Sequence, residues 1–116
     1  TGTTATLRGV WGSSPTDVYA VSLNVGGPAV ILRYNGSSWS VVHSSTHALR
    51  GIHGRAPNEV YAVGDGPTIF RFNGTTWTEE EPSGVVAGTQ LFGVWASPTG
   101  PVYVVGAGSL VLRGVP

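Results

Sequence analysis

Arginine and tryptophan side chains recur at matching places in this sequence, and they are its clearest candidates for chemistry. Arginine donates several hydrogen bonds in a fixed planar fork and stacks on flat surfaces, and a tryptophan face stacks on apolar or ring-shaped groups. Such side chains suit a site that holds a ligand by hydrogen bonding and stacking. The candidate ligand-binding residues are Arg33, Arg71, Trp39, Trp77, Trp11, His53 and Trp95.

The tryptophans also have a structural interpretation. Trp39 and Trp77 follow equivalent turns, and they could wedge between neighbouring sheets instead of binding a ligand. The matching places of Trp11, His53 and Trp95 could equally be packing positions around an inner channel. Both interpretations stay open for each of these residues.

The arginines have a structural interpretation as well. Arg33, Arg71 and Arg113 recur in the same strand-like segment of a chain in which only 10% of residues are charged. A buried arginine needs a carboxylate or carbonyl partner, because unpaired burial is costly. Asp17 and Glu59 recur too, which predicts an arginine–carboxylate bridge between neighbouring repeats.

A repeat of 42 residues must position all of these side chains. The segment LRGVWGSSPTDVYAV at 7–21 returns as LRGIHGRAPNEVYAV at 49–63 and as LFGVWASPTGPVYVV at 91–105. A period near 40 residues built from short strands is typical of a propeller blade. The repeats cover 7–48, 49–90 and 91–116, which predicts that 1–116 forms a single β-propeller domain or part of one.

Each repeat is predicted to contain four antiparallel strands joined by short turns. Alternation and β-branched composition place the first four at 7–12, 17–21, 30–34 and 38–43. Asn35-Gly36 and Asn73-Gly74 are hairpin signals, because both residues accept positive φ. The third repeat lacks the fourth strand, so the prediction is an all-β fold of about eleven strands, or about 2.75 blades, without helix.

The repeated apolar positions are the predicted core. They are Val10, Val18, Ala20, Val21, Leu32, Ile52, Val60, Ala62, Val63, Phe70, Val94, Val102, Val104, Val105 and Leu112.

The composition argues against several function classes. A formal net charge of zero provides nothing to neutralise nucleic-acid phosphates or bind an anionic membrane. There is no cysteine for thiolate chemistry, and no apolar run approaches the ~20 residues of a membrane-spanning helix. His43, His47 and His53 match no zinc spacing, and no nucleophile–base pattern is present. We therefore expect no nucleic-acid partner, membrane insertion, metal, cofactor or enzyme activity.

The repeats resemble those of a known group of proteins. LRGVWGSSPTDVYAV, ILRYNGSSWS and the second copy IHGRAPNEVYAVGDGPTIFRFNGTTWT are similar to blades of bacterial surface or secreted β-propellers, including tectonin-like and other tryptophan-glycine repeat propellers. The resemblance covers nearly the whole chain. It implies a lectin-like module at the cell surface or outside the cell, with aromatic and arginine side chains between or on top of blades.

The predicted function is therefore a non-enzymatic binding module whose ligand is a carbohydrate. The alternative is a structural protein–protein scaffold within a larger extracellular or surface assembly. Propellers close with typically 4 to 8 blades, so three blades need a complement. We expect either a homo-oligomer, with two copies giving six blades, or further blades of a longer chain.

Overall fold

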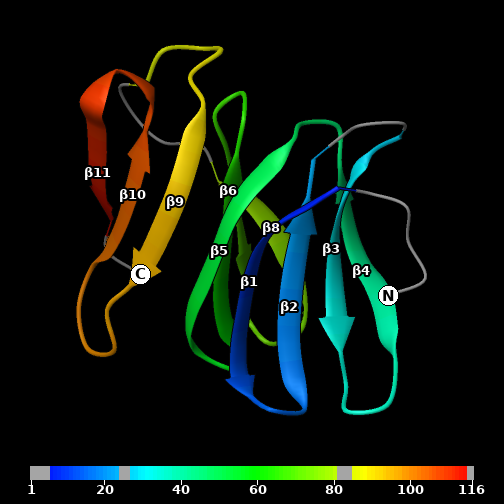
Figure 1. The fold of residues 1–116 in the computed structure, drawn as a ribbon. Coiled ribbons are helices and arrows are strands. Elements are labelled where there is room, and N and C mark those ends of the chain that lie inside the picture. The colour runs from blue at the N-terminus through cyan, green and yellow to red at the C-terminus, as the bar shows by residue number, and fades with distance from the viewer. Residues whose placement is uncertain (1–5, 24–26, 81–84, 115–116) are drawn as a thin grey trace.

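Three antiparallel sheets lie side by side in the computed structural model, which describes residues 6–23, 27–80 and 85–114 (Figure 1). Blade 1 contains β1 (Leu7–Ser14), β2 (Asp17–Ser22), β3 (Ala29–Tyr34) and β4 (Trp39–Ser45). Blade 2 contains β5 (Leu49–Ala56), β6 (Glu59–Gly64), β7 (Thr68–Phe72) and β8 (Trp77–Glu80). Blade 3 contains β9 (Leu91–Ala96), β10 (Val102–Gly106) and β11 (Leu110–Gly114). The predicted grouping of four, four and three strands is confirmed.

Within each blade the strands pair in chain order. In the described part of the chain, the helical content is a three-residue 3-10 turn, Ala107–Ser109, between β10 and β11. Gly108 has a φ of 71° there, a value that glycine adopts without strain. No helix of the described residues is long and apolar enough to cross a membrane.

The two Asn-Gly hairpins are present, and the asparagine acts through its side chain. Asn35 Oδ1 accepts hydrogen bonds from the backbone N–H groups of Ser37 at 2.9 Å and Ser38 at 3.0 Å. Gly36 follows with a φ of 101°. Asn73 and Gly74 repeat this arrangement in blade 2. The asparagine therefore builds a local turn of the kind that its short side chain favours.

The blades pack through their inner strands, β1, β5 and β9. A Cβ atom added to Gly9 would lie 3.4 Å from the Cα of Gly51, and one added to Gly51 would lie 3.1 Å from the Cα of Gly93. The backbones approach too closely for a side chain between them. These contacts explain the glycine in the first two repeats, at Gly9 and Gly51.

The hydrophobic core lies between the blades. Each blade has a leading face toward the next blade in the chain and a trailing face toward the preceding one. Between blades 1 and 2, the buried residues of the two facing surfaces form one cluster. Its main members are Tyr19, Val21, Ile31, Leu49, Ile52 and Val60. A second cluster joins blades 2 and 3 through Tyr61, Val63, Leu91, Val102 and Val104.

Two predicted core residues are wrong. Val10 is 68% exposed and Val105 is 45% exposed. Val10 lies on the trailing face of blade 1 and Val105 on the leading face of blade 3, where no further blade covers them. Their repeat equivalents, Ile52 and Val63, are buried because each faces a neighbouring blade. Of the remaining predicted positions, Val18, Val94 and Leu112 are half-buried.

Candidate functional site

A groove of about 420 Å³ opens between blades 1 and 2, at the end of the blades where β1 turns into β2. Blade 1 contributes Asp17, Tyr19, Arg33 and Val42 to its lining. Blade 2 contributes Pro57, Phe72, Gly74, Thr75 and Trp77. Two of the residues predicted to bind a ligand, Arg33 and Trp77, therefore meet in one cavity from opposite blades.

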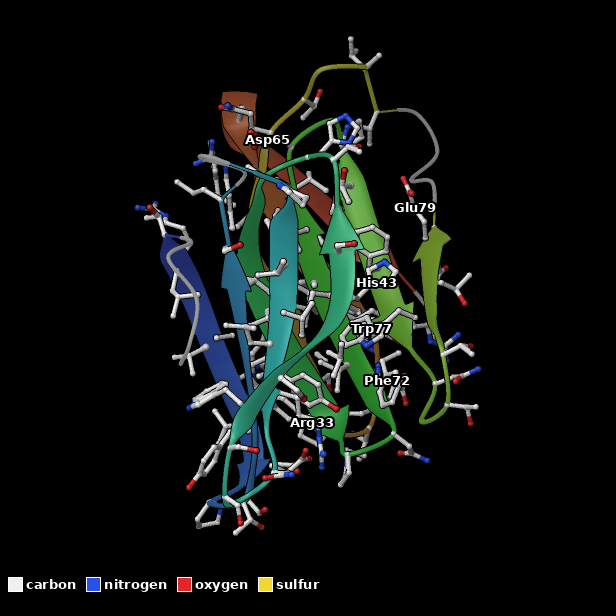
Figure 2. The ribbon with its side chains drawn as sticks, turned by 90° about the vertical axis from the view of Figure 1, so that its right-hand side faces the viewer. Arg33, His43, Asp65, Phe72, Trp77 and Glu79 are labelled. Atoms are coloured by element: carbon white, nitrogen blue, oxygen red, sulfur yellow. The ribbon has the colours of Figure 1, made fainter. Side chains whose placement is uncertain are left out.

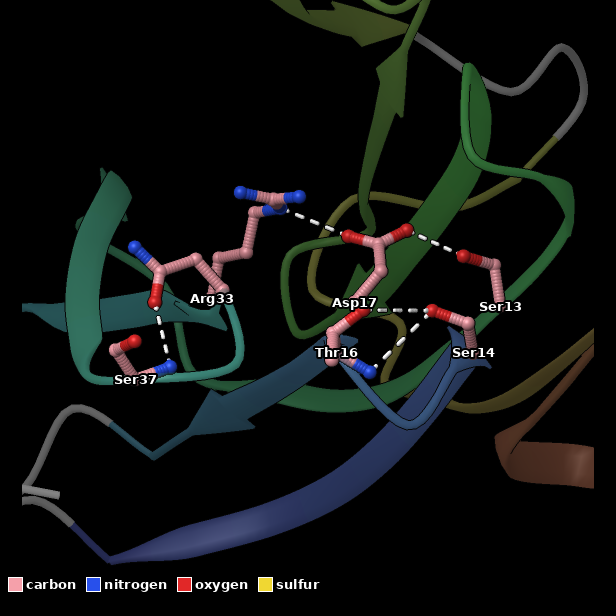
Figure 3. Close-up of polar contacts among 7 residues, drawn as sticks. Ser13, Ser14, Thr16, Asp17, Arg33 and Ser37 are labelled. Carbon is pink, nitrogen blue, oxygen red and sulfur yellow. Dashed lines mark hydrogen bonds and ion pairs between the residues drawn. The ribbon is translucent and has the colours of Figure 1, made fainter.

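The polar wall of the groove is an ion pair within blade 1. The pairing of Tyr19 with Arg33 places Asp17, two residues before Tyr19, diagonally beside the arginine on the same sheet face. Arg33 Nε donates to Asp17 Oδ1 at 2.8 Å, and Ser13 Oγ donates to Asp17 Oδ2 (Figure 3). The predicted bridge between neighbouring repeats is thus wrong, since the antiparallel register already joins the two residues within one blade.

This ion pair presents its cation to the groove. The Arg33 side chain is 39% exposed, whereas that of Asp17 is 13% exposed and is held by two donors. The hydrogen bond to Asp17 raises the pKa of Arg33. Burial, followed by the nearby charge of Asp17, raises the pKa of the Tyr19 hydroxyl. At neutral pH the groove therefore contains a charged guanidinium and a protonated phenol.

The opposite wall is aromatic. Trp77 stacks on Phe72 with ring centroids 5.1 Å apart and meets the edge of Tyr19 at 5.9 Å. His43 stacks on the same indole at 6.2 Å, and burial lowers the pKa of this histidine. Figure 2 shows Arg33, Phe72, Trp77 and His43 following one another along the space between the two blades. Contacts on several sides fix the orientation of the indole.

Trp39 and Arg71 lie elsewhere. Trp39 packs on Tyr34 at 5.3 Å, on the trailing face of blade 1 and away from the groove. Arg71 is the repeat equivalent of Arg33 on the leading face of blade 2. Its Nη2 is 3.8 Å from Glu59 Oε2, and its guanidinium lies 5.9 Å from the Tyr61 ring centroid. The side chain of Arg113 lies outside the described part of the structure.

Trp11, His53 and Trp95 form a row along the inner strands, separate from the groove. The ring centroids are 6.0 Å apart from Trp11 to His53 and 6.4 Å apart from His53 to Trp95. His53 Nδ1 accepts a hydrogen bond from the backbone N–H of Ala96 at 3.0 Å. Trp11 and His53 each contact the following blade, at Gly54 and Ala96 respectively.

Sequence reasoning did not select Tyr19 and Phe72 as groove residues. The signal was available in the register, because Tyr19 pairs with Arg33 and Phe72 pairs with Trp77. No group of three metal-ligating side chains occurs among the residues that the structure describes.

Comparison with known proteins identifies the architecture. No protein-family model matches the sequence, and no curated protein matches it either. A solved β-propeller structure, YCF48 bound to D1 peptide, is similar, with a TM-score of 0.73 at 16% sequence identity. The match covers 98% of this chain and 38% of the YCF48 chain. The chain thus spans well under half the length of that protein, and its three sheets are two complete blades and one partial blade of a β-propeller.

Proposed function

We propose that this chain is a non-enzymatic binding module and that the groove between blades 1 and 2 binds a carbohydrate. The observation that carries the proposal is the meeting of Arg33 and Trp77 across a groove of about 420 Å³. Concave sites that pair apolar lining with a few placed polar groups are the usual form of a small-ligand site. The proposed setting is the cell surface or the outside of the cell.

A sugar ring fits the chemistry of both walls. One face of a pyranose carries C–H groups that stack on an indole, and its edge carries hydroxyls that both donate and accept hydrogen bonds. Trp77 and Phe72 provide the apolar aromatic wall, the exposed Arg33 guanidinium provides donors, and Asp17 holds that guanidinium in place. The near balance of charge between Arg33 and Asp17 favours a neutral ligand over a strongly anionic one.

A protein ligand is the alternative. The structure of YCF48 was solved with a peptide bound, so a propeller of similar fold takes a protein segment. Exposed apolar side chains on the outer faces of blades 1 and 3 are also typical of protein interfaces. Under this alternative the chain is a structural scaffold in a larger surface assembly.

A glycan array with matched tryptophan variants tests the proposal. Trp77→Ala removes the largest aromatic side chain of the groove wall, and we expect binding to weaken about tenfold or more, the equivalent of ~1.4 kcal/mol. Trp39→Ala is the control, because it removes the equivalent tryptophan of the first repeat on the face away from the groove. It should leave binding unchanged. Arg33→Gln should also weaken binding while leaving the aromatic packing in place.

Thermal unfolding of each variant separates lost binding from lost fold. Equal effects of Trp39→Ala and Trp77→Ala on glycan affinity would place the ligand outside the groove. Absence of glycan binding by the folded wild-type chain, together with binding to immobilised peptides, would replace the carbohydrate proposal with the scaffold alternative.

A further inference from the structure

The two outer faces of the three-blade unit expose apolar side chains. The leading end face belongs to blade 3 and consists of Trp95, Tyr103, Val105 and Val111. The trailing end face belongs to blade 1, where Leu7, Val10 and Val41 are exposed while Ala20 and Leu32 of the same face are buried. Contiguous exposed apolar surface on a folded protein marks an interaction site.

The interfaces inside the chain show what covers such faces. Tyr19 and Val21, the first-repeat equivalents of Tyr103 and Val105, are buried against blade 2. Leu49, the second-repeat equivalent of Leu7, is buried against blade 1. Each end face therefore resembles one side of an internal interface. The end face of blade 3 resembles the leading side, and the end face of blade 1 resembles the trailing side.

The inner strand of blade 3 leaves room for another backbone. A Cβ atom at Gly51 would meet the backbone of β9, with Phe92 O at 3.0 Å and the Cα of Gly93 at 3.1 Å. Among the described residues, a Cβ atom at Gly93 would meet one side-chain atom within 4 Å, Val105 Cγ2 at 3.3 Å. Glycine at this position is thus unexplained by the contacts of blade 3 itself. An inner strand packed beside β9 would require it.

In each internal interface, the size of the aromatic ring also matches the size of the residue on which it packs in the next blade. Trp11 lies over Gly54, where an added Cβ would be only 2.7 Å from the indole Cη2. In the next interface the smaller ring of His53 lies beside Ala96, the repeat equivalent of Gly54. The large indole therefore sits on glycine, and the small imidazole sits on alanine.

The same rule selects the partner of Trp95. Its exposed indole requires a glycine at the facing position, and the first repeat has Gly12 there, 42 residues before Gly54. The three atoms nearest to a Cβ added at Gly12 all belong to blade 1, on Ser14, Asp17 and Val18. Gly12 is also exposed, so in the described part of the chain an indole could approach it from outside the blade.

From these matches we infer that the leading end face of one copy docks on the trailing end face of a second copy, with Trp95 seated over Gly12. The contact is heterologous, and such contacts form rings when the rotation closes. Two copies of three blades give six, within the typical range of 4 to 8. Each copy then covers both apolar end faces of the other.

Substitutions at Trp95 and at Gly12 test this pairing. Sedimentation velocity of the purified 116-residue chain at micromolar concentration should show a dimer. Gly12→Ala places a methyl group against the indole, and we expect dimerisation to weaken about tenfold or more. The double variant Gly12→Ala with Trp95→His reproduces the His53–Ala96 pair. It should recover dimerisation to within a few-fold of the wild type.

Two controls and three outcomes make the test decisive. Far-UV circular dichroism checks that Gly12→Ala still folds, and Val86→Asp introduces a charge at an exposed valine that belongs to neither end face. A wild-type monomer would overturn the inference and leave the end faces to other blades or another protein. A dimer unaffected by Gly12→Ala would place the contact elsewhere. A series of ever larger species would exclude a closed pair.

Discussion

Leucine truncation at one repeat position measures how much of the stability comes from packing between blades. Leu7, Leu49 and Leu91 are repeat equivalents, yet Leu7 is 39% exposed whereas the other two are 0% exposed. Burying a leucine contributes about 1.5–3 kcal/mol by transfer, and the cavity left behind brings Leu→Ala costs to about 2–5 kcal/mol. We expect a loss of about 3 kcal/mol for Leu49→Ala and for Leu91→Ala.

Leu7→Ala should cost only about 1 kcal/mol, because part of the side chain already contacts water and its removal opens no closed cavity. The difference of about 2 kcal/mol corresponds to roughly a 30-fold change in the folding equilibrium constant. Urea denaturation at submicromolar concentration measures all three variants with the least contribution from association. Equal costs for Leu7→Ala and Leu49→Ala in a monomeric sample would refute the assignment of Leu7 to an uncovered face. If two copies associate, the cost of Leu7→Ala should rise with protein concentration.

Two further predictions concern titration and close packing. Burial lowers the pKa of His53 in the folded chain, so the unfolded chain binds its proton first and stability should fall as the pH drops below about 6.5. His53→Asn keeps an acceptor for the Ala96 N–H without titrating, and thermal unfolding from pH 7.5 to 5.5 should show a smaller loss than in the wild type. Gly64→Ala would place a Cβ atom 1.9 Å from Ala48 O, so we expect destabilisation of about 3 kcal/mol or more by urea denaturation. Gly100→Ala has no neighbour closer than 3.4 Å and should stay within ~0.5 kcal/mol of the wild type, whereas similar losses for both variants would contradict the packing argument.

The fold was predictable because the repeat encodes each blade locally. Alternation, the Asn-Gly turns and the constant step between repeats define strands and order without reference to distant contacts. The predicted core was less accurate, because it was chosen by repeat position without regard to which blade faces are covered. Val10 and Ile52 occupy the same repeat position. Ile52 is buried because it faces blade 1, whereas Val10 faces no other blade of the structure and is exposed.

The site was only partly predictable for a related reason. Residue type pointed to Arg33 and Trp77 as binding residues, but it pointed equally to Trp39 and Arg71. Sequence spacing does not reveal which face of a blade packs against which neighbouring blade. The register supplies that information for the ion pair, because Asp17 and Arg33 lie diagonally on adjacent strands. For Trp77 the deciding contact is with Tyr19 of another blade, which no local pattern contains.

Similar repeats also produce unequal sites, because a groove combines residues from two different repeats. Between blades 1 and 2 the carboxylate of Asp17 serves a single guanidinium, that of Arg33. In blade 2 the equivalent carboxylate, Glu59, lies 3.1 Å from Arg55 Nε and 3.8 Å from Arg71 Nη2, and it also accepts from the Tyr61 hydroxyl. Arg71 therefore shares its partner and has a different electrostatic setting from Arg33. The glycine and leucine positions that hold the blades together tolerate this variation, since none of them lines the groove. Binding chemistry can thus change at one junction while the architecture remains the same.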